Sequence, residues 1–402
     1  MRSKPANVLL ITAAQVLALS LWFSGTAAGP GLLREAANPV AGFQSWLTSA
    51  VQAGFVLGTL CSALVSLADR LDPRRLFAAC ALAGGLANAA ILLLPAGSAA
   101  DLVCRFMTGV TLAGVYPVGM KLAVGWADRA DTGLVIGLLV GGLTLGSSLP
   151  HLANALGGLD WRVTVGAASA AAWAGSLLSL CAGLGPRHAA GSAFRPDDVL
   201  LLWRNRGTRL ATLGYLGHMW ELYAMWAWVG AYLTASFAAS GAAASPSLAA
   251  AATFAVIGVG ALGSVAAGRL ADRVGRVRVT TVAMGVSGAC CLLAGPLFAT
   301  HPALTTALCL VWGVAVVADS AQFSASVAEL SPPGLTGTTL TVQTCLGFAL
   351  TLASIQLMPL LIARLGWGPA FAALAIGPAL GILAMRALGR SPAAAHLAGG
   401  RG

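Results

Sequence analysis

Charged residues are scarce in this chain, and the motifs of most enzymes are missing. Only 9% of its 402 residues are charged, against about a quarter in a typical soluble domain, and 58% are apolar. Water is therefore not the main solvent of this protein. The sequence also has no His-Glu-x-x-His zinc helix, no Gly-x-Ser-x-Gly nucleophile turn and no phosphate-binding glycine loop with Lys. A membrane enzyme is therefore a remote alternative only.

The cysteines and the basic residues exclude further classes. All eight cysteines fall inside apolar runs and none forms a Cys-x-x-Cys pair, so we expect no disulfide, no metal and no cofactor. The net charge of +10 is spread over the loops between apolar runs and forms no basic domain. We therefore expect no nucleic-acid partner.

Apolar runs of about 20 residues recur along the whole chain, and each is long enough to cross a bilayer. Backbone groups in lipid must be satisfied within their own segment, so such runs predict helices, which gives an all-α membrane protein. The first run has a basic start but is longer than a signal peptide core, and we expect it to be uncleaved. The twelve predicted spans are 7–29, 43–68, 76–95, 101–125, 133–156, 162–184, 208–238, 247–270, 279–299, 303–327, 335–362 and 367–388.

The positive residues predict the orientation. With the N-terminus inside, cytoplasmic segments hold 18 Lys and Arg residues and the other side holds three, so both termini should be cytoplasmic. The polar stretch 185–206 then becomes a cytoplasmic linker between an N-terminal six-helix bundle, 1–184, and a C-terminal one, 207–402. Abundant Ala, Gly and Arg with only two Lys indicates a GC-rich bacterial genome and hence the inner membrane, where we expect a functional monomer.

An internal repeat relates the two halves at an offset of about 204 residues. Parallel six-helix repeats place a substrate site between the halves near the middle of the membrane, so the repeat predicts function as well as fold. Three pairs of segments carry it: 65–70 with 268–273, 160–161 with 366–367, and 20–25 with 224–230.

The stretch from Gly268 to Arg276 resembles the Gly-x-Leu-Ala-Asp-Arg-x-Gly-Arg loop motif of the major facilitator superfamily. The first copy is degenerate, with Val65 in place of the first Gly, which puts a close helix approach there in doubt. The resemblance implies a basic turn whose Asp contacts a neighbouring helix N-terminus and latches one conformation. A plain positive-inside turn is the alternative. The predicted latch residues are Asp69, Arg70, Arg74, Gly268, Asp272, Arg273, Gly275 and Arg276.

Two further segments resemble the same family. Arg105 and Gly109 in the fourth span match its Arg-x-x-x-Gly motif, which implies a part in proton transfer for Arg105. The fifth span is rich in Gly, as in many exporters of the family, but Ser147 stands where their motif has Pro. This departure favours uptake over efflux.

Ionisable residues inside the membrane are costly, so each one is a candidate for function. His218 and Glu221 lie three residues apart and therefore on one face of the seventh span. Desolvation favours a neutral carboxyl and imidazole titrates near neutral pH, so this pair could load and release a proton. A hydrogen bond that only holds helices together is the alternative reading. Asp319 in the tenth span is a second buried acid that could accept protons or pair with the cations of span four.

The remaining candidates line a predicted substrate cavity between the halves. Arg105 and Lys121 would supply positive charge to it, and packing or snorkelling to the headgroups is the alternative for Lys121. The predicted substrate-binding residues are Arg105, Trp220, Tyr223, Trp226, Gln322, Tyr116, Gln15, Trp22, Gln343 and Lys121.

These features together predict a proton-coupled secondary transporter that works by alternating access, with protons and a small molecule as partners in a lipid bilayer. The cationic residues favour symport of a small organic or inorganic anion, as in the nitrate and carboxylate branches that the resemblance brings to mind. Proton-driven efflux of a drug-like compound or metabolite is the alternative. A membrane sensor built like a transporter is a third reading, without any signalling domain to support it.

Overall fold

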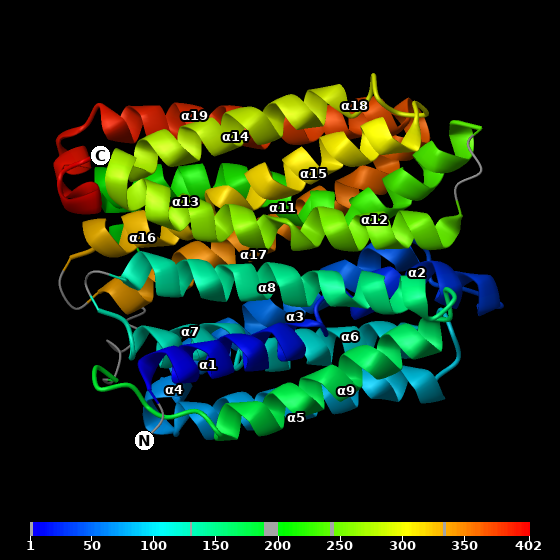
Figure 1. Cartoon of the computed structure of the whole chain (residues 1–402), viewed down its shortest axis with the longest axis horizontal. Coiled ribbons are helices and arrows are strands. Elements are labelled where there is room, and N and C mark those ends of the chain that lie inside the picture. The colour runs from blue at the N-terminus through cyan, green and yellow to red at the C-terminus, as the bar shows by residue number, and fades with distance from the viewer. Residues whose placement is uncertain (1–2, 129–130, 189–199, 242–244, 333–334) are drawn as a thin grey trace.

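The computed structural model describes residues 3–128, 131–188, 200–241, 245–332 and 335–402 (Figure 1). These residues form helices and no strand, as the apolar runs predict. The predicted linker 185–206 lies partly outside the described residues, because 189–199 are not among them.

The first half contains six spans, of which the first and the fourth are broken. A break at residues 20–23 divides the first span, and Pro117 stands in the first turn of the second part of the fourth, where its missing N–H has no helical partner to lose. The helices are α1 (Lys4–Leu19), α2 (Ser24–Glu35), α3 (Phe43–Leu64), α4 (Leu67–Arg70), α5 (Pro73–Ala90), η1 (Ile91–Leu93), α6 (Ala99–Leu112), α7 (Tyr116–Val124), α8 (Thr132–Leu156) and α9 (Trp161–Leu180).

The second half repeats this arrangement with different interruptions. Its first span is one long helix, whereas the fourth is divided at Asp319. The helices are α10 (Leu201–Arg204), α11 (Arg206–Ala239), α12 (Pro246–Gly258), α13 (Gly260–Val274), α14 (Arg276–Leu293), α15 (Pro302–Ala318), α16 (Ser320–Leu330), α17 (Thr336–Leu365), α18 (Trp367–Ala372), η3 (Ala373–Ala375), α19 (Ile376–Gly389) and η4 (Pro392–Gly399).

Eleven helical segments of the described chain are long and apolar enough to cross a membrane. The 34-residue helix α11 is not among the eleven, because His218, Glu221 and several Trp and Tyr residues lower its hydropathy. Its length and its place in the repeat make it a span as well, the seventh in chain order, which brings the total to twelve. The fold is therefore an all-α membrane fold of two pseudo-symmetric six-helix bundles.

The two bundles meet mainly along helices α8 and α3 of the first half. Helix α8 of the first half packs against α12 and α13 of the second, and the three lie side by side across the middle of Figure 1. Helix α3 likewise packs against α17. Both termini lie at one end of the molecule (Figure 1), which we call the terminal face, and the end that carries Glu35 and Pro246 we call the opposite face.

Glycines at equivalent positions bring helices into backbone contact in both halves. A Cβ on Gly109 would lie 2.0 Å from the carbonyl oxygen of Val51, and one on Gly313 would lie 1.9 Å from that of Val256. These two contacts are related by the offset of about 204 residues that the sequence repeat predicts. The repeat is therefore built into the packing of α3 on α6 and of α12 on α15.

We expect Gly109→Ala and Gly313→Ala each to lower the free energy of unfolding by about 1–3 kcal/mol, because the added methyl group pushes two helices apart. Gly285→Ala is the matched control, since nothing lies within 4 Å of a Cβ there. Thermal unfolding of the purified variants measures the effect. Equal unfolding temperatures for Gly313→Ala and Gly285→Ala would contradict the close packing.

Candidate functional site

The most unusual pair of ionisable groups joins α11 to the break between α15 and α16. The Nδ1 atom of His218 lies 2.9 Å from Oδ1 of Asp319, and both side chains are only 2% exposed. The contact is close but not aligned as a hydrogen bond, so we describe it as an ion pair that forms when the imidazole is protonated. Nε2 of the same ring lies 2.8 Å from the hydroxyl of Ser320. One proton on this pair gives it zero net charge, and loss of that proton leaves a buried aspartate.

Glu221 takes its partners elsewhere in the second half. Its carboxyl accepts hydrogen bonds from Trp312 Nε1 at 2.6 Å, Ser287 Oγ at 2.9 Å and Cys291 Sγ at 3.2 Å. These residues belong to α14 and α15, so the carboxyl is enclosed within the second bundle. Glu221 and His218 therefore do not contact each other as their spacing suggests, because each side chain leaves α11 toward a different partner.

Arg105 lies in the core of the first bundle and is fully buried. Its Nη2 donates to the carbonyl oxygens of Leu21 and Trp22, and its Nη1 donates to Ser24 Oγ and Asn88 Oδ1. In an unbroken helix, backbone N–H groups would bond the carbonyl groups of Leu21 and Trp22; at the break between α1 and α2 the guanidinium takes their place. Arg105 thus holds the interruption of the first span, and in this conformation these donors are not free for an anion.

A small cavity of about 90 Å³ lies between the two halves, near the middle of the spans. His218 lines it, together with the predicted residues Tyr116, Tyr223 and Trp226. Tyr215 also lines the cavity but is not among the residues predicted from the sequence, although a Tyr one turn before His218 in an apolar span indicates a cavity-lining residue. The hydroxyl groups and the imidazole in its wall come from Tyr116, Thr144, Tyr215, His218, Tyr223, Ser320, Ser324 and Thr344.

Six aromatic rings close the central cavity on its opposite-face side. The ring of Phe55 is tilted against its neighbours, with its centroid 4.5 Å from that of Phe348 and 4.9 Å from that of Trp22, and the ring centroid of Phe348 lies 5.1 Å from that of Tyr223. Trp22 and Tyr223 come from different halves and lie 5.8 Å apart. We call this set the aromatic cluster; its members are Trp22, Phe23, Phe55, Tyr223, Trp226 and Phe348.

Beyond the aromatic cluster lies a vestibule of about 460 Å³ that opens toward the opposite face. Its walls come from α2, α3 and α8 of the first half and from α11 and α12 of the second. Ala227 and Gly230 line it one turn beyond Tyr223 and Trp226, which line the central cavity. His151 also lines the vestibule, and the sequence analysis did not single it out, although a His in a Gly-rich apolar span is a signal.

Three predicted cavity residues lie away from the central cavity. Trp220 faces α19 and donates from Nε1 to the carbonyl oxygen of Ala373 at 3.3 Å. Gln15 donates to the carbonyl oxygen of Leu139 at 2.8 Å, within the first half. Gln343 is buried with no hydrogen-bond partner for either amide atom, and it is not part of the cavity wall. In this conformation none of the three contacts the central cavity.

The second loop motif closes the terminal face between the halves. A Cβ on Gly133, in the first turn of α8, would lie 2.4 Å from Oδ2 of Asp272, so this carboxylate rests against the helix N-terminus as predicted. Arg276 donates to both carboxylate oxygens of Glu329, at 2.9 and 2.6 Å, and to Gln322 Oε1 at 2.7 Å. Gln322 therefore belongs to the loop motif and not to the substrate cavity.

The glycines and the other arginine of this motif also fit its geometry. Gly275 has a φ of +95°, which favours glycine, and a Cβ on Gly268 would lie 3.1 Å from the carbonyl oxygen of Gly133. Arg273 and Arg70, its counterpart in the first copy, are both exposed. Val65, which replaces Gly in that copy, is 47% exposed and makes no such approach.

The first loop motif is held by different residues. Asp72 caps α5 and accepts hydrogen bonds from Arg74 Nε and Nη2, and this guanidinium lowers the pKa of Asp72 to about 2. Lys121 donates to the carbonyl oxygen of Ala68 at 2.7 Å, so it contacts this loop and not a substrate site. The side chain of Asp69 lies outside the described part of the structure.

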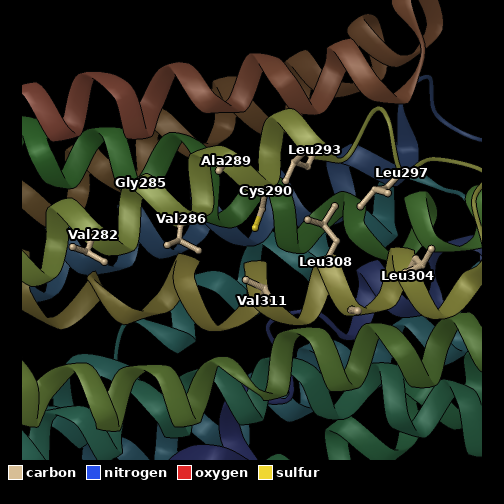
Figure 2. A pocket seen from close by; sticks show the side chains of 11 residues that line it. Val282, Gly285, Val286, Ala289, Cys290, Leu293, Leu297, Leu304, Leu308 and Val311 are labelled. Carbon is tan, nitrogen blue, oxygen red and sulfur yellow. The ribbon is translucent and has the colours of Figure 1, made fainter.

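A larger cavity of about 570 Å³ is an apolar furrow between α14 and α15 (Figure 2). It lies within one half, and its lining residues Leu304 and Val311 are 57% and 52% exposed. Lipid-facing surface accounts for such a furrow, so we do not assign it to the substrate. Among the described residues, no three His, Cys, Asp or Glu side chains gather as metal ligands.

Comparisons with known proteins agree with this arrangement. The family model of the Major Facilitator Superfamily matches residues 10–342, whereas no curated protein sequence matches the chain. The solved structure of a mutant of the nucleoside transporter NupG aligns with a TM-score of 0.71 at 14% identity, over 95% of this chain and 99% of that one. The human organic anion transporter MFSD10 aligns with a TM-score of 0.70 at 17% identity, over 96% and 100%. Since the family model covers most of the chain, this protein belongs to the major facilitator superfamily of secondary transporters.

Proposed function

We propose that this transporter couples substrate uptake to protons through the ion pair of His218 and Asp319. The observation that carries the proposal is its position: the pair is buried, lies at the break of the tenth span, and borders the cavity between the halves. Ionisable groups inside a membrane mark ion and proton pathways. Protonation changes the charge of the pair from −1 to zero and with it the free energy of the contact between α11 and α16.

The closed contacts on both faces support alternating access. At the terminal face, Asp272 rests on α8 and Ser264 Oγ donates to the carbonyl oxygen of Gly137 at 3.0 Å. Toward the opposite face, Gln356 of α17 contacts Ser45 and Ser49 of α3 at 2.9 and 3.1 Å. The central cavity of about 90 Å³ is smaller than the roughly 300–1,000 Å³ of ordinary ligand pockets, so a substrate has to displace the aromatic cluster.

The cavity chemistry supports a small polar molecule with a planar ring as substrate. Aromatic rings offer stacking surfaces and the hydroxyl groups of Tyr116, Thr144 and Tyr215 offer hydrogen bonds, while His218 is the one basic group of the described lining. Nucleosides, which the structural neighbour NupG transports by its name, have this chemistry.

A small organic anion is the second candidate. The sequence favours an anion through the positive charge of Arg105 and Lys121, but in the structure both side chains donate to protein carbonyl groups and not to the cavity. What still favours an anion is His218, whose protonated imidazole would face the cavity. The neighbour MFSD10 is an organic anion transporter by its name.

Reconstituted uptake distinguishes these candidates. We would reconstitute the protein into liposomes in a known orientation. Counterflow of nucleosides, free nucleobases and small carboxylates would then be measured with and without an imposed pH gradient. Uptake of a planar polar compound that is stimulated by external acid supports the proposal. Accumulation of a compound against an outward flow of protons would instead support efflux by proton exchange. If the pH gradient changes the transport of none of the compounds, proton coupling is overturned.

We also propose that the second loop motif holds the two halves together at the terminal face. We assign this face to the cytoplasmic side of a bacterial inner membrane. Asp272→Asn should weaken the attraction to the α8 N-terminus, which is worth about 0.3–1 kcal/mol at an exposed site, and so shift the population toward the terminal-open state two- to fivefold, roughly. Crosslinking of cysteines placed at the ends of α8 and α13 would measure this shift. Arg390→Ala, an exposed residue beyond the motif, is the control, and an unchanged crosslinking yield in Asp272→Asn would contradict the latch.

A further inference from the structure

The vestibule on the opposite face has two chemically different walls. The wall from the first half carries the polar side chains of the vestibule beside apolar residues such as Leu33 and Leu159; the polar ones are Thr26, Arg34, Gln44, His151 and Asn154. The wall from α11 and α12 is made of small residues, mainly Ala, with Gly230, Pro246 and two Thr. A molecule with a polar end and an apolar body would match both walls at once.

The polar wall contains hydrogen-bonding atoms that the protein leaves unused. Nε2 of His151 is buried without a partner, and the residue as a whole is 6% exposed. Gln44 donates from Nε2 to the carbonyl oxygen of Thr26 at 3.1 Å, and its Oε1, an acceptor that lies against Gly29, offers nothing to a ligand oxygen. A buried N–H without an acceptor costs free energy, so His151 Nε2 in the wall of the cavity marks a place where a ligand oxygen supplies the missing bond.

The charges around the vestibule are positive. Arg34 is an exposed residue of its lining, and its Nη2 donates to the carbonyl oxygen of Leu159 at 3.2 Å. No acidic residue is among the described lining residues. The nearby Glu35 is bound on both oxygens by Arg162, each at 2.8 Å, which neutralises it. An anion entering from the opposite face therefore meets no carboxylate in the wall.

We propose that the vestibule is a binding site for an organic carboxylate with an apolar body. The carboxylate lies on the first-half wall, where His151 Nε2 donates a hydrogen bond and Arg34 supplies positive charge at the mouth. The apolar body lies against the small residues of α11 and α12, which leave room for a ring or a short alkyl chain. A volume of about 460 Å³ is within the usual range for small-molecule sites.

This site is separate from the central cavity. The aromatic cluster lies between the two, and neither His218 nor Asp319 lines the vestibule. The proposal concerns binding only, so it does not depend on proton coupling or on the identity of the transported substrate. Failure of the transport experiment would leave the binding result intact.

Fluorine NMR of 4-fluorobenzoate with the purified protein in nanodiscs tests the proposal. We expect saturable binding to the wild type and affinity lowered about tenfold or more in His151→Leu, which removes the hydrogen bond to a charged group. His151→Gln keeps an N–H donor and should retain part of the affinity. His396→Leu, at an exposed residue of the terminal face, is the matched control and should bind as the wild type does.

The neutral analogue 4-fluorobenzamide completes the test, because it has the same ring and nearly the same size without the charge. We expect it to bind more weakly than the carboxylate in the wild type and to be less sensitive to His151→Leu. Equal binding of 4-fluorobenzoate by the wild type and a correctly folded His151→Leu protein, equal binding of the amide and the carboxylate, or no saturable binding of the carboxylate would each overturn the proposal. Thermal unfolding of each variant establishes that it is folded.

Discussion

Asp319→Asn should abolish accumulation driven by a proton gradient while exchange of substrate across the membrane continues. A gradient of about one pH unit can drive up to about tenfold accumulation in a symporter that moves one proton per substrate, because one pH unit is worth 1.36 kcal/mol. Without the Asp319 carboxylate, a proton on His218 would be an uncompensated charge inside the membrane, so the site no longer takes up the proton and the accumulation ratio should fall from about ten to about one. Exchange requires only that the loaded carrier change conformation, and the neutral Asn imitates the proton-loaded pair.

Glu221→Gln is the matched control for this experiment. Both residues are buried acids of the second half, but Glu221 is bound by Trp312, Ser287 and Cys291 and does not line the central cavity. We expect Glu221→Gln to keep gradient-driven accumulation if the protein remains folded. Accumulation that survives in Asp319→Asn and disappears in folded Glu221→Gln would move the proton site from the ion pair to the enclosed carboxyl.

Arg105→Ala should destabilise the protein by about 3 kcal/mol or more, because it leaves a cavity and removes the guanidinium donors of the Leu21 and Trp22 carbonyl groups, of which Leu21 keeps only the hydroxyl of Ser24. Arg105→Lys should recover only part of this loss. A single ammonium group cannot reproduce the fork of a guanidinium, which here bonds three backbone carbonyls, a hydroxyl and a side-chain amide.

Denaturant unfolding and the yield of folded protein measure the effect of Arg105. Arg364→Ala, at an exposed residue outside any network described above, is the control and should unfold as the wild type does. A folded and equally stable Arg105→Ala protein that has lost anion binding would contradict the structural role and restore Arg105 as a substrate ligand.

Hydropathy was sufficient to predict most of the fold. The spans, the two halves and the offset of about 204 residues all follow from the sequence, and Trp161 and Trp367, which the repeat aligns, begin α9 and α18. The interruptions did not follow from it. The break at residues 20–23 contains no Pro or Gly and depends on the donors of Arg105, a residue more than eighty positions away.

The candidate site was only partly predictable for a related reason. Spacing places His218 and Glu221 on one face of a helix, but it does not say which neighbouring helix each side chain meets. In the structure α11 packs against α15 and α16, and the Glu221 side chain also reaches α14, so two residues one turn apart meet different partners. Asp319 was identified from its burial alone, and its pairing with His218 needed the three-dimensional structure.

We propose that the charge of the His218–Asp319 pair sets which face of the transporter is open. Spin labels at positions 154 and 238, on the two walls of the vestibule, would report its width by pulsed electron resonance without any substrate. Between about pH 5.5 and about pH 8, on either side of the usual imidazole range, we expect the distance distribution to shift in the wild type and to stay fixed in Asp319→Asn. The same pH-dependent shift in both proteins would contradict the account.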